Sequence, residues 1–170
     1  MAKKDKKLCN MKTVYLVRHA KSSWKYPGLE DFERPLNKRG RKSALLMGNI
    51  LNKLKTVPDL VISSPANRAA MTARMIAAKI NYPLAKILYR EAIYMSDETA
   101  LVDVIKNMDD AVQQAMLIGH NPGLTELVND ISDQRISNIP TGGVCCLDLK
   151  ITSWKEVREH CGRLRFFEFP

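Results

Sequence analysis

Short apolar runs alternate with segments of helical periodicity along most of this chain. Four runs have the length and composition of buried strands, and they cover residues 13–17, 59–62, 86–89 and 115–118. A segment follows each run in which apolar residues recur at i, i+3, i+4 and i+7. These segments cover residues 47–54, 73–80, 101–108 and 124–131. That spacing places the apolar side chains on one face of a helix, so the chain begins with four strand–helix repeats.

Four strand–helix repeats predict an α/β fold of three layers, α/β/α, with a mostly parallel central sheet flanked by helices. The last part of the chain has a different pattern. Residues 144–151 and 163–169 are two further strand candidates, with no convincing helix between them. We expect one or both to extend the sheet, and antiparallel pairing is an option for them.

Side chains that commonly cap helices stand at the predicted helix starts. Ser64-Pro65 and Asn121-Pro122 each place a capping side chain before a proline, which is favoured at the first helical position. We therefore predict that Ser64 and Asn121 cap the second and fourth helices.

Length and composition are those of one globular domain. The chain has 170 residues, of which 45% are hydrophobic and 26% charged. We expect residues 1–11 to be a disordered basic tail and residues 12–170 to form a single domain. No apolar run has the length of a membrane span, and the basic N-terminus lacks the apolar core of a signal peptide. These features predict a cytoplasmic protein that does not bind membranes.

The four cysteines and three histidines show no metal-binding pattern. None of the cysteines is spaced C-x-x-C, and none is followed six positions later by arginine, as a thiol-based phosphatase loop requires. We expect Cys9, Cys145, Cys146 and Cys161 to be reduced and unligated. We therefore predict neither a metal nor another cofactor.

The formal net charge of +9 at pH 7 is unevenly distributed. Residues 1–12 carry +4, residues 13–55 carry +7 and residues 56–170 carry −2. A basic face of this kind is typical of nucleic-acid-binding modules. A basic tail combined with an anion-binding site in the first third of the domain would give the same distribution.

Charged and titratable residues follow each of the four predicted strands. Arg18 and His19 end the first strand, and Arg68 falls in the first turn of the helix after the second. Glu91 follows the third strand and His120 the fourth. Because ligands bind outside the carboxyl ends of the strands in open α/β sheets, we expect these side chains to meet at one edge. Each alone has the plainer interpretation of a surface or packed residue.

Phosphoryl transfer is the chemistry that such a set suits. Arginine binds phosphate oxygens through two parallel hydrogen bonds and stays charged at any working pH. A neutral imidazole can act as the nucleophile and divide one displacement into two. No metal is needed if Arg18, Arg68 and a protonated His120 supply the positive charge.

Four ordered segments resemble the motifs of the histidine phosphatase superfamily, also called phosphoglycerate-mutase-like. Residues 17–24 (VRHAKSSW) resemble its R-H-G/A signature, and residues 34–40 (RPLNKRG) its R-P-L-T/N-x-x-G segment. Residues 63–69 (SSPANRA) and 118–122 (IGHNP) resemble its S-P-x-x-R-A and G-H-x-P motifs. The short chain and the form of the first motif are most similar to SixA-type phosphohistidine phosphatases.

The resemblance implies a phosphoglycerate-mutase-like fold and a role for each matched residue. His19 would be the phosphorylated nucleophile, and Arg18, Arg68 and His120 would form the phosphate pocket. Glu91 stands where the family's L-x-E segment supplies a general acid, although the match is loose. Ser22 would donate a hydrogen bond to phosphate, or it is a plain turn hydroxyl.

The expected activity is that of a metal-independent phosphohydrolase that acts through a phosphohistidine intermediate. The substrate that we favour is phosphohistidine on a protein, because the chain lacks the long insertions with which mutases hold a sugar phosphate. A small-molecule phosphomonoesterase with the same site is the alternative within enzymes. A basic nucleic-acid-binding module is the alternative from another class. We expect no nucleic acid as partner, and the sequence does not indicate the oligomeric state.

Overall fold

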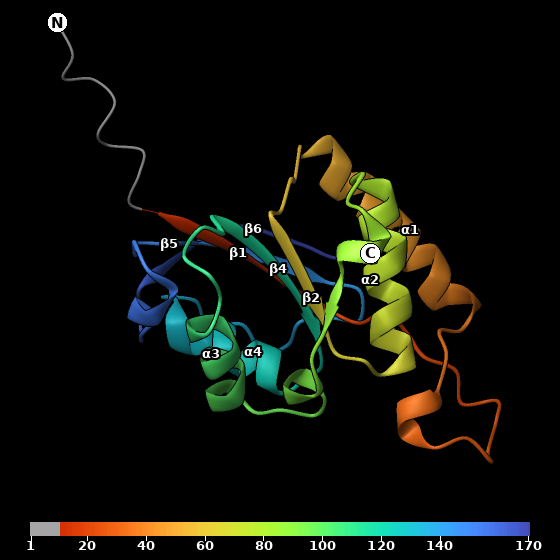
Figure 1. Cartoon of the computed structure of the whole chain (residues 1–170). Coiled ribbons are helices and arrows are strands. Elements are labelled where there is room, and N and C mark those ends of the chain that lie inside the picture. The colour runs from red at the N-terminus through yellow and green to blue at the C-terminus, as the bar shows by residue number, and fades with distance from the viewer. Residues whose placement is uncertain (1–10) are drawn as a thin grey trace, which may run out of the picture.

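The computed structural model describes residues 11–170, which build a six-stranded sheet with the strand order β3-β2-β4-β1-β5-β6 (Figure 1). The strands are β1 (Lys12–Arg18), β2 (Leu60–Ser63), β3 (Leu88–Tyr89), β4 (Gln114–Gly119), β5 (Val144–Leu149) and β6 (Gly162–Glu168). β1 pairs in parallel with β4, and β2 pairs in parallel with β4 and β3. β5 is antiparallel to β1, and β6 is antiparallel to β5. We expected one or both late strands to extend the sheet, and this is confirmed: both do, with antiparallel pairing.

Two pairs of helices cover the two faces of the sheet (Figure 1). They are α1 (Lys38–Lys53) and α2 (Asn67–Lys79) on one face, and α3 (Glu98–Lys106) and α4 (Gly123–Ile131) on the other. Successive side chains of a strand point to opposite faces. Tyr15 and Val17 of β1 therefore pack toward α1 and α2, whereas Val14 and Leu16 pack toward α3 and α4. This is the predicted three-layer α/β/α fold.

The predicted third strand is shorter than its apolar run. The first part of that run belongs to a 3-10 turn, η2 (Leu84–Lys86), and only Leu88–Tyr89 pair with β2. The two residues lie at the edge of the sheet and are exposed. A 3-10 turn, η4 (Trp154–Glu156), is the one helical element between β5 and β6.

The predicted caps at Ser64 and Asn121 are wrong. α2 begins at Asn67 and α4 at Gly123, and no side chain caps either helix. The Ser64 hydroxyl instead bonds to His120, and the Asn121 amide bonds to Asn138 and Ile139. Both side chains are used at the edge of the sheet where the functional residues lie.

The predictions about the N-terminal tail, the domain boundaries, the cysteines and a membrane span have different outcomes. All of the expected tail except Met11 lies outside the described residues, and so does Cys9. That residues 12–170 form a single domain stays a prediction.

The other three cysteines are free and buried, and burial raises the pKa of Cys145 and Cys146 to about 12. Among the described helices, none combines the length and the apolar character that a membrane span requires.

Candidate active site

A cavity of about 320 Å³ lies at the carboxyl ends of β1 and β4, beside the start of α2. Five of the predicted site residues line it, and they are Arg18, His19, Ser22, Arg68 and His120. The side chains that follow β1, β2 and β4 therefore meet at one edge of the sheet, as expected. Arg18, Lys21, Arg34 and Arg68 give the wall four basic side chains, and Asp31 is its one carboxylate. Such an excess of positive charge favours an anion as ligand.

Two hydrogen bonds fix the ring orientation and the tautomer of His19. Its Nδ1 lies 2.8 Å from the carbonyl oxygen of Ala20, and Arg68 Nε lies 3.3 Å from its Nε2. Because a carbonyl only accepts and a guanidinium only donates, these contacts assign the proton to Nδ1 and the lone pair to Nε2. Burial lowers the pKa of His19 to about 4, and the charges of Arg68 and Arg18 act in the same direction. The imidazole is therefore neutral at pH 7, as a nucleophile must be.

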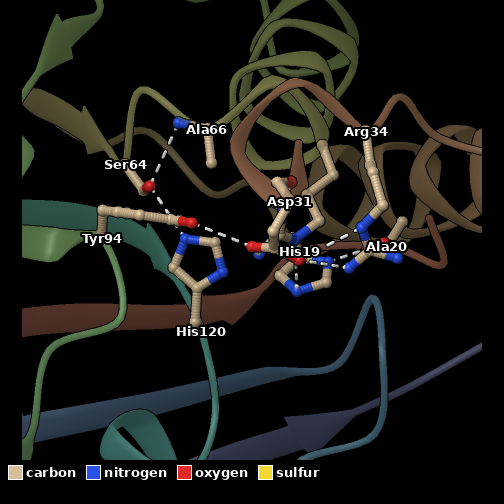
Figure 2. A network of polar contacts seen from close by, with 9 residues as sticks. His19, Ala20, Asp31, Arg34, Ser64, Ala66, Tyr94 and His120 are labelled. Carbon is tan, nitrogen blue, oxygen red and sulfur yellow. Dashed lines mark hydrogen bonds and ion pairs between the residues drawn. The ribbon is translucent and has the colours of Figure 1, made fainter. Parts of the chain in front are cut away.

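His120 lies opposite His19 across the cavity, with the ring centroids 5.0 Å apart (Figure 2). Its Nε2 shares a hydrogen bond of 2.8 Å with Ser64 Oγ, which also accepts from the Ala66 amide. Burial, together with the neighbouring His19 and Arg68, lowers the pKa of His120 to about 3. The ring is therefore neutral in the free protein at pH 7, because burial and neighbouring arginines disfavour its protonated form. A protonated His120 during phosphoryl transfer stays a prediction.

Asp31 joins three side chains around the cavity (Figure 2). One carboxylate oxygen accepts from Arg34, and the other accepts from Arg68 Nη2 and from the Tyr94 hydroxyl, each at 2.9 Å. Burial would raise the pKa of Asp31, but the hydrogen bonds from Arg34, Tyr94 and Arg68 hold it at about 2. The carboxylate is therefore ionised at neutral pH and fixes two arginines.

Sequence reasoning gave no role to Asp31, Arg34 or Tyr94. Arg34 belongs to the quoted R-P-L segment, so the resemblance contained a signal for it. Asp31 stands three residues before Arg34 in a 3-10 turn, η1 (Asp31–Glu33), and its spacing resembles no motif. Tyr94 follows another 3-10 turn, η3 (Glu91–Ile93), and reaches the site only through tertiary contact.

Several donors of the cavity wall have no acceptor. Arg18 Nη1 donates to Asn138 and to the carbonyl of Ile139, but Arg18 Nε is buried without a partner. Within residues 11–170, the buried side-chain atoms without a hydrogen-bond partner are Arg18 Nε, Arg34 Nη1, His120 Nδ1 and Asn121 Oδ1. All four belong to residues that line the cavity. Asn121 Oδ1 can only accept, but Arg18 Nε and Arg34 Nη1 are donors and His120 Nδ1 is one when it carries the ring proton. Buried polar atoms are rarely left unpaired, so this wall offers donors to an oxyanion.

The R-P-L-N-x-x-G segment shapes the loop that follows His19. Asn37 caps α1 by accepting from the Gly40 amide, and its side-chain amide donates to the carbonyl of Ser22. A Cβ on Gly40 would collide with the carbonyl oxygen of Lys21. The glycine therefore allows α1 to begin directly against the loop that carries Lys21 and Ser22.

Thr72 of α2 ties the peptide after His19 to the first turn of the helix that carries Arg68. Its hydroxyl donates to the carbonyl of Arg68 at 2.7 Å and accepts from the Ala20 amide at 3.0 Å. Thr72 is fully buried. The peptide after His19 and the first turn of α2 are thus held together by one side chain.

Glu91 lies apart from the other predicted site residues. It begins η3, is exposed, and is not among the residues that line the cavity. Its role as a general acid stays a prediction. Within the described residues, no group of three or more His, Cys, Asp or Glu side chains is placed to hold a metal ion.

Comparisons with known proteins agree with this geometry. A family model for the histidine phosphatase superfamily (branch 1) matches residues 14–92. The uncharacterized protein Rv1276c of Mycobacterium tuberculosis (strain ATCC 25618 / H37Rv) is 30% identical over 165 residues, which cover 91% of this chain and 99% of the relative.

Solved structures extend the likeness over the same length. The candidate phosphohistidine phosphatase SixA from Agrobacterium tumefaciens is 30% identical with a TM-score of 0.78, covering 94% of this chain and 98% of that one. The protein histidine phosphatase SixA, solved with tungstate, is 20% identical with a TM-score of 0.79. That match covers 93% of this chain and 97% of the other, and it supports the fold. The resemblance inferred from the four motifs is confirmed.

Proposed function

The chain belongs to the histidine phosphatase superfamily and is a phosphatase, and from this premise we propose that it removes phosphoryl groups from histidine side chains of proteins through a phosphohistidine formed on His19. One observation carries the proposal. The unpartnered donors of Arg18 and Arg34 and the free Nδ1 of His120 surround the same cavity as the Nε2 lone pair of His19. A phosphoryl group supplies the oxygens that these donors lack.

The first step transfers the phosphoryl group to the enzyme. His19 Nε2 attacks phosphorus, the new N–P bond forms, and the N–P bond of the substrate breaks. The departing imidazole nitrogen takes up a proton from solvent. Arg18 and Arg68 bind the equatorial oxygens, whose charge must be neutralised in the transition state, and Ser22 lies in the wall as a further donor.

His120 assists through the nitrogen that has no partner. Because Ser64 Oγ already accepts from the Ala66 amide, its own proton is available for His120 Nε2. In that arrangement His120 Nδ1 carries a hydrogen and donates it to a phosphoryl oxygen. The dianion would also raise the pKa of His120, because an opposite charge favours the protonated ring.

The second step returns the enzyme to its starting state. Water attacks the phosphorus of phosphorylated His19, the N–P bond breaks, and inorganic phosphate leaves. The water contributes its oxygen to phosphate and releases a proton to solvent. His19 Nε2 then regains its lone pair.

A phosphorylated imidazole is the substrate that the cavity suits best. Its leaving group departs more readily than an alkoxide, so a strong general acid is less needed. This agrees with an exposed Glu91 and with an Asp31 whose pKa of about 2 keeps it ionised. A small-molecule phosphomonoesterase would need a proton donor beside the ester oxygen.

Replacement of the nucleophile tests the mechanism. With a protein labelled with ³²P on histidine, we expect wild type to release phosphate and to form an acid-labile phosphoenzyme. His19→Ala should lose both, because no other nitrogen takes its place. His160→Ala is the matched control, since this histidine is exposed and lies outside the cavity.

Turnover by His19→Ala at the wild-type rate would contradict the phosphohistidine mechanism. The same assay run with a panel of small phosphomonoesters separates the two substrate classes. Faster hydrolysis of those esters than of phosphohistidine would favour the small-molecule alternative. The cytoplasmic location and the absence of a nucleic-acid partner stay predictions.

A further inference from the structure

Two exposed apolar side chains, Trp24 and Met95, stand at the mouth of the catalytic cavity. We infer that Trp24 and Met95 form a recognition rim that binds the imidazole of a phosphorylated histidine and the protein surface around it. This inference rests on the proposed function and adds to it the residues that select the substrate. The rim selects among phosphorylated compounds by contacting the group to which the phosphoryl group is attached.

The exposure of the two side chains is unusual for their type. Trp24 is 78% exposed and Met95 is 63% exposed. Among the other large apolar side chains of the described residues, only Val57, at 65%, is more exposed than Met95, and Tyr26 follows at 56%. Val57 lies outside the cavity, whereas Trp24 and Met95 both line it. Exposed apolar groups gathered at a cavity mark a surface that a partner covers.

The Trp24 ring stacks on the guanidinium of Arg34. The guanidinium carbon of Arg34 lies 3.5 Å from the centroid of the Trp24 ring, and Arg34 is nearly buried. Two nitrogens of Arg34 are fixed by Asp31. The indole therefore rests on a cation that is itself anchored, and most of its surface stays open to solvent.

Hydrogen bonds of its two neighbours in the chain fix the backbone on either side of Met95. The hydroxyl of Tyr94 donates to Asp31, and the Ser96 hydroxyl donates to the carbonyl of Ile93. A Cβ on Gly123 would collide with the carbonyl oxygen of Ser96, so α4 packs closely against this segment. The Trp24 ring and the backbone that carries Met95 are thus positioned before any substrate arrives, which lowers the entropy cost of binding.

The chemistry of the rim fits a phosphorylated imidazole on a protein. With the phosphoryl group at Arg18, His19 and Arg68, the group attached to it must leave through the mouth that Trp24 and Met95 border. A planar imidazole stacks well on an indole. A methionine adapts to the varied apolar surface of a protein partner. A substrate without a ring or an apolar surface gains nothing from either contact.

The test compares two substrates with the same type of bond. One is a protein phosphorylated on histidine, and the other is phosphoramidate, which has a P–N bond but no ring and no surrounding protein. For Trp24→Ala we expect the ratio of kcat/KM for the protein to kcat/KM for phosphoramidate to fall at least about tenfold, mainly through KM. Met95→Ala should lower the ratio about threefold, and Trp24→Phe should restore most of it because it keeps a ring.

Val57→Ala is the matched control, since it removes an equally exposed side chain away from the cavity, and it should leave both values unchanged. An unchanged ratio in Trp24→Ala would overturn the inference. Such a result would mean that Trp24 acts only through Arg34 and affects both substrates alike. If wild type hydrolyses phosphoramidate but not the phosphorylated protein, or hydrolyses neither substrate, the proposed function itself is overturned, whereas activity on the protein with an unchanged ratio in Trp24→Ala overturns the rim alone.

Discussion

Two arginine–aspartate pairs, one within the antiparallel half of the sheet and one beyond the carboxyl ends of its parallel strands, use the same groups for different purposes. In the antiparallel half, Arg165 of β6 binds Asp148 of β5 through Nε and Nη2. Arg165 Nη2 also donates to Thr13. At the carboxyl ends of the parallel strands, Arg68 binds Asp31, which Arg34 shares.

The balance of charge separates the two pairs. Arg165 and Asp148 form one cation with one carboxylate, and that arrangement is complete in itself. Asp31 is the one carboxylate in a cavity wall with four basic side chains, two of which keep a buried donor without an acceptor. An ion pair that satisfies itself is structural, whereas a wall with surplus cations and unused donors is prepared for an anion.

The largest effect that this comparison predicts is on catalysis. Arg68→Ala should lower kcat/KM for a histidine-phosphorylated protein at least about 100-fold, because a transition-state donor and the contact with His19 are both lost. Arg165→Ala should stay within about twofold of wild type. Steady-state kinetics on the two variants check this.

Arg68 is nearly buried, so its replacement needs a second variant that keeps the charge. Arg68→Lys should lose about tenfold, because lysine lacks the planar fork that binds two phosphoryl oxygens. Thermal melting confirms that each variant is folded. An equal loss of activity in Arg68→Ala and Arg165→Ala would mean that the distinction between the two pairs is mistaken.

A smaller effect concerns the carboxylates. Asp31→Asn should lower the inhibition constant of inorganic phosphate by roughly tenfold, because a negative charge beside the bound anion is removed. Asp148→Asn should leave this constant unchanged, since Asp148 lies outside the cavity. Product inhibition measured by kinetics checks both. A weaker inhibition in Asp31→Asn would show that Asp31 serves more to position Arg34 and Arg68 than to oppose the anion.

The central site could be predicted because it follows from local sequence. Apolar periodicity locates β1, β2 and β4, and residues directly after parallel strands share an edge. This brought Arg18, His19, Arg68 and His120 together, as the structure shows. Glu91 lies apart because strand order is a tertiary property. β3 is the edge strand, separated from β1 by β2 and β4.

The other differences between the sequence-based predictions and the structure also arise from contacts between residues that are distant in the sequence. Ser64 has the pattern of a helix cap, but its hydroxyl is used by His120, a residue 56 positions away. Asp31 and Tyr94 meet across 63 positions and belong to no periodic segment. The charge of His120 depends on burial and on neighbouring charges, which sequence spacing does not describe. Contacts between loops are therefore the part that sequence patterns leave out.

The smallest predicted effect separates the two regions by their response to acid. His19 and His120 have folded-state pKa values of about 4 and about 3, well below the usual value near 6.5. Between about pH 6.5 and pH 4 the unfolded chain therefore binds protons that the folded protein does not. Stability falls as the pH falls through this window. We expect the melting temperature of wild type to drop by ~5 °C more than that of His19→Gln or His120→Gln.

The antiparallel pair supplies the control for this prediction. Arg165→Gln removes a charge that does not titrate in this window, so its melting temperature should be lower than that of wild type by a similar amount at pH 7 and at pH 4.5. Melting curves at four pH values between 7 and 4.5 distinguish the two kinds of slope. If the histidine variants lose stability with acid as steeply as wild type, the imidazoles are not held neutral by the cavity. The neutral His19 that the proposed mechanism requires would then need another explanation.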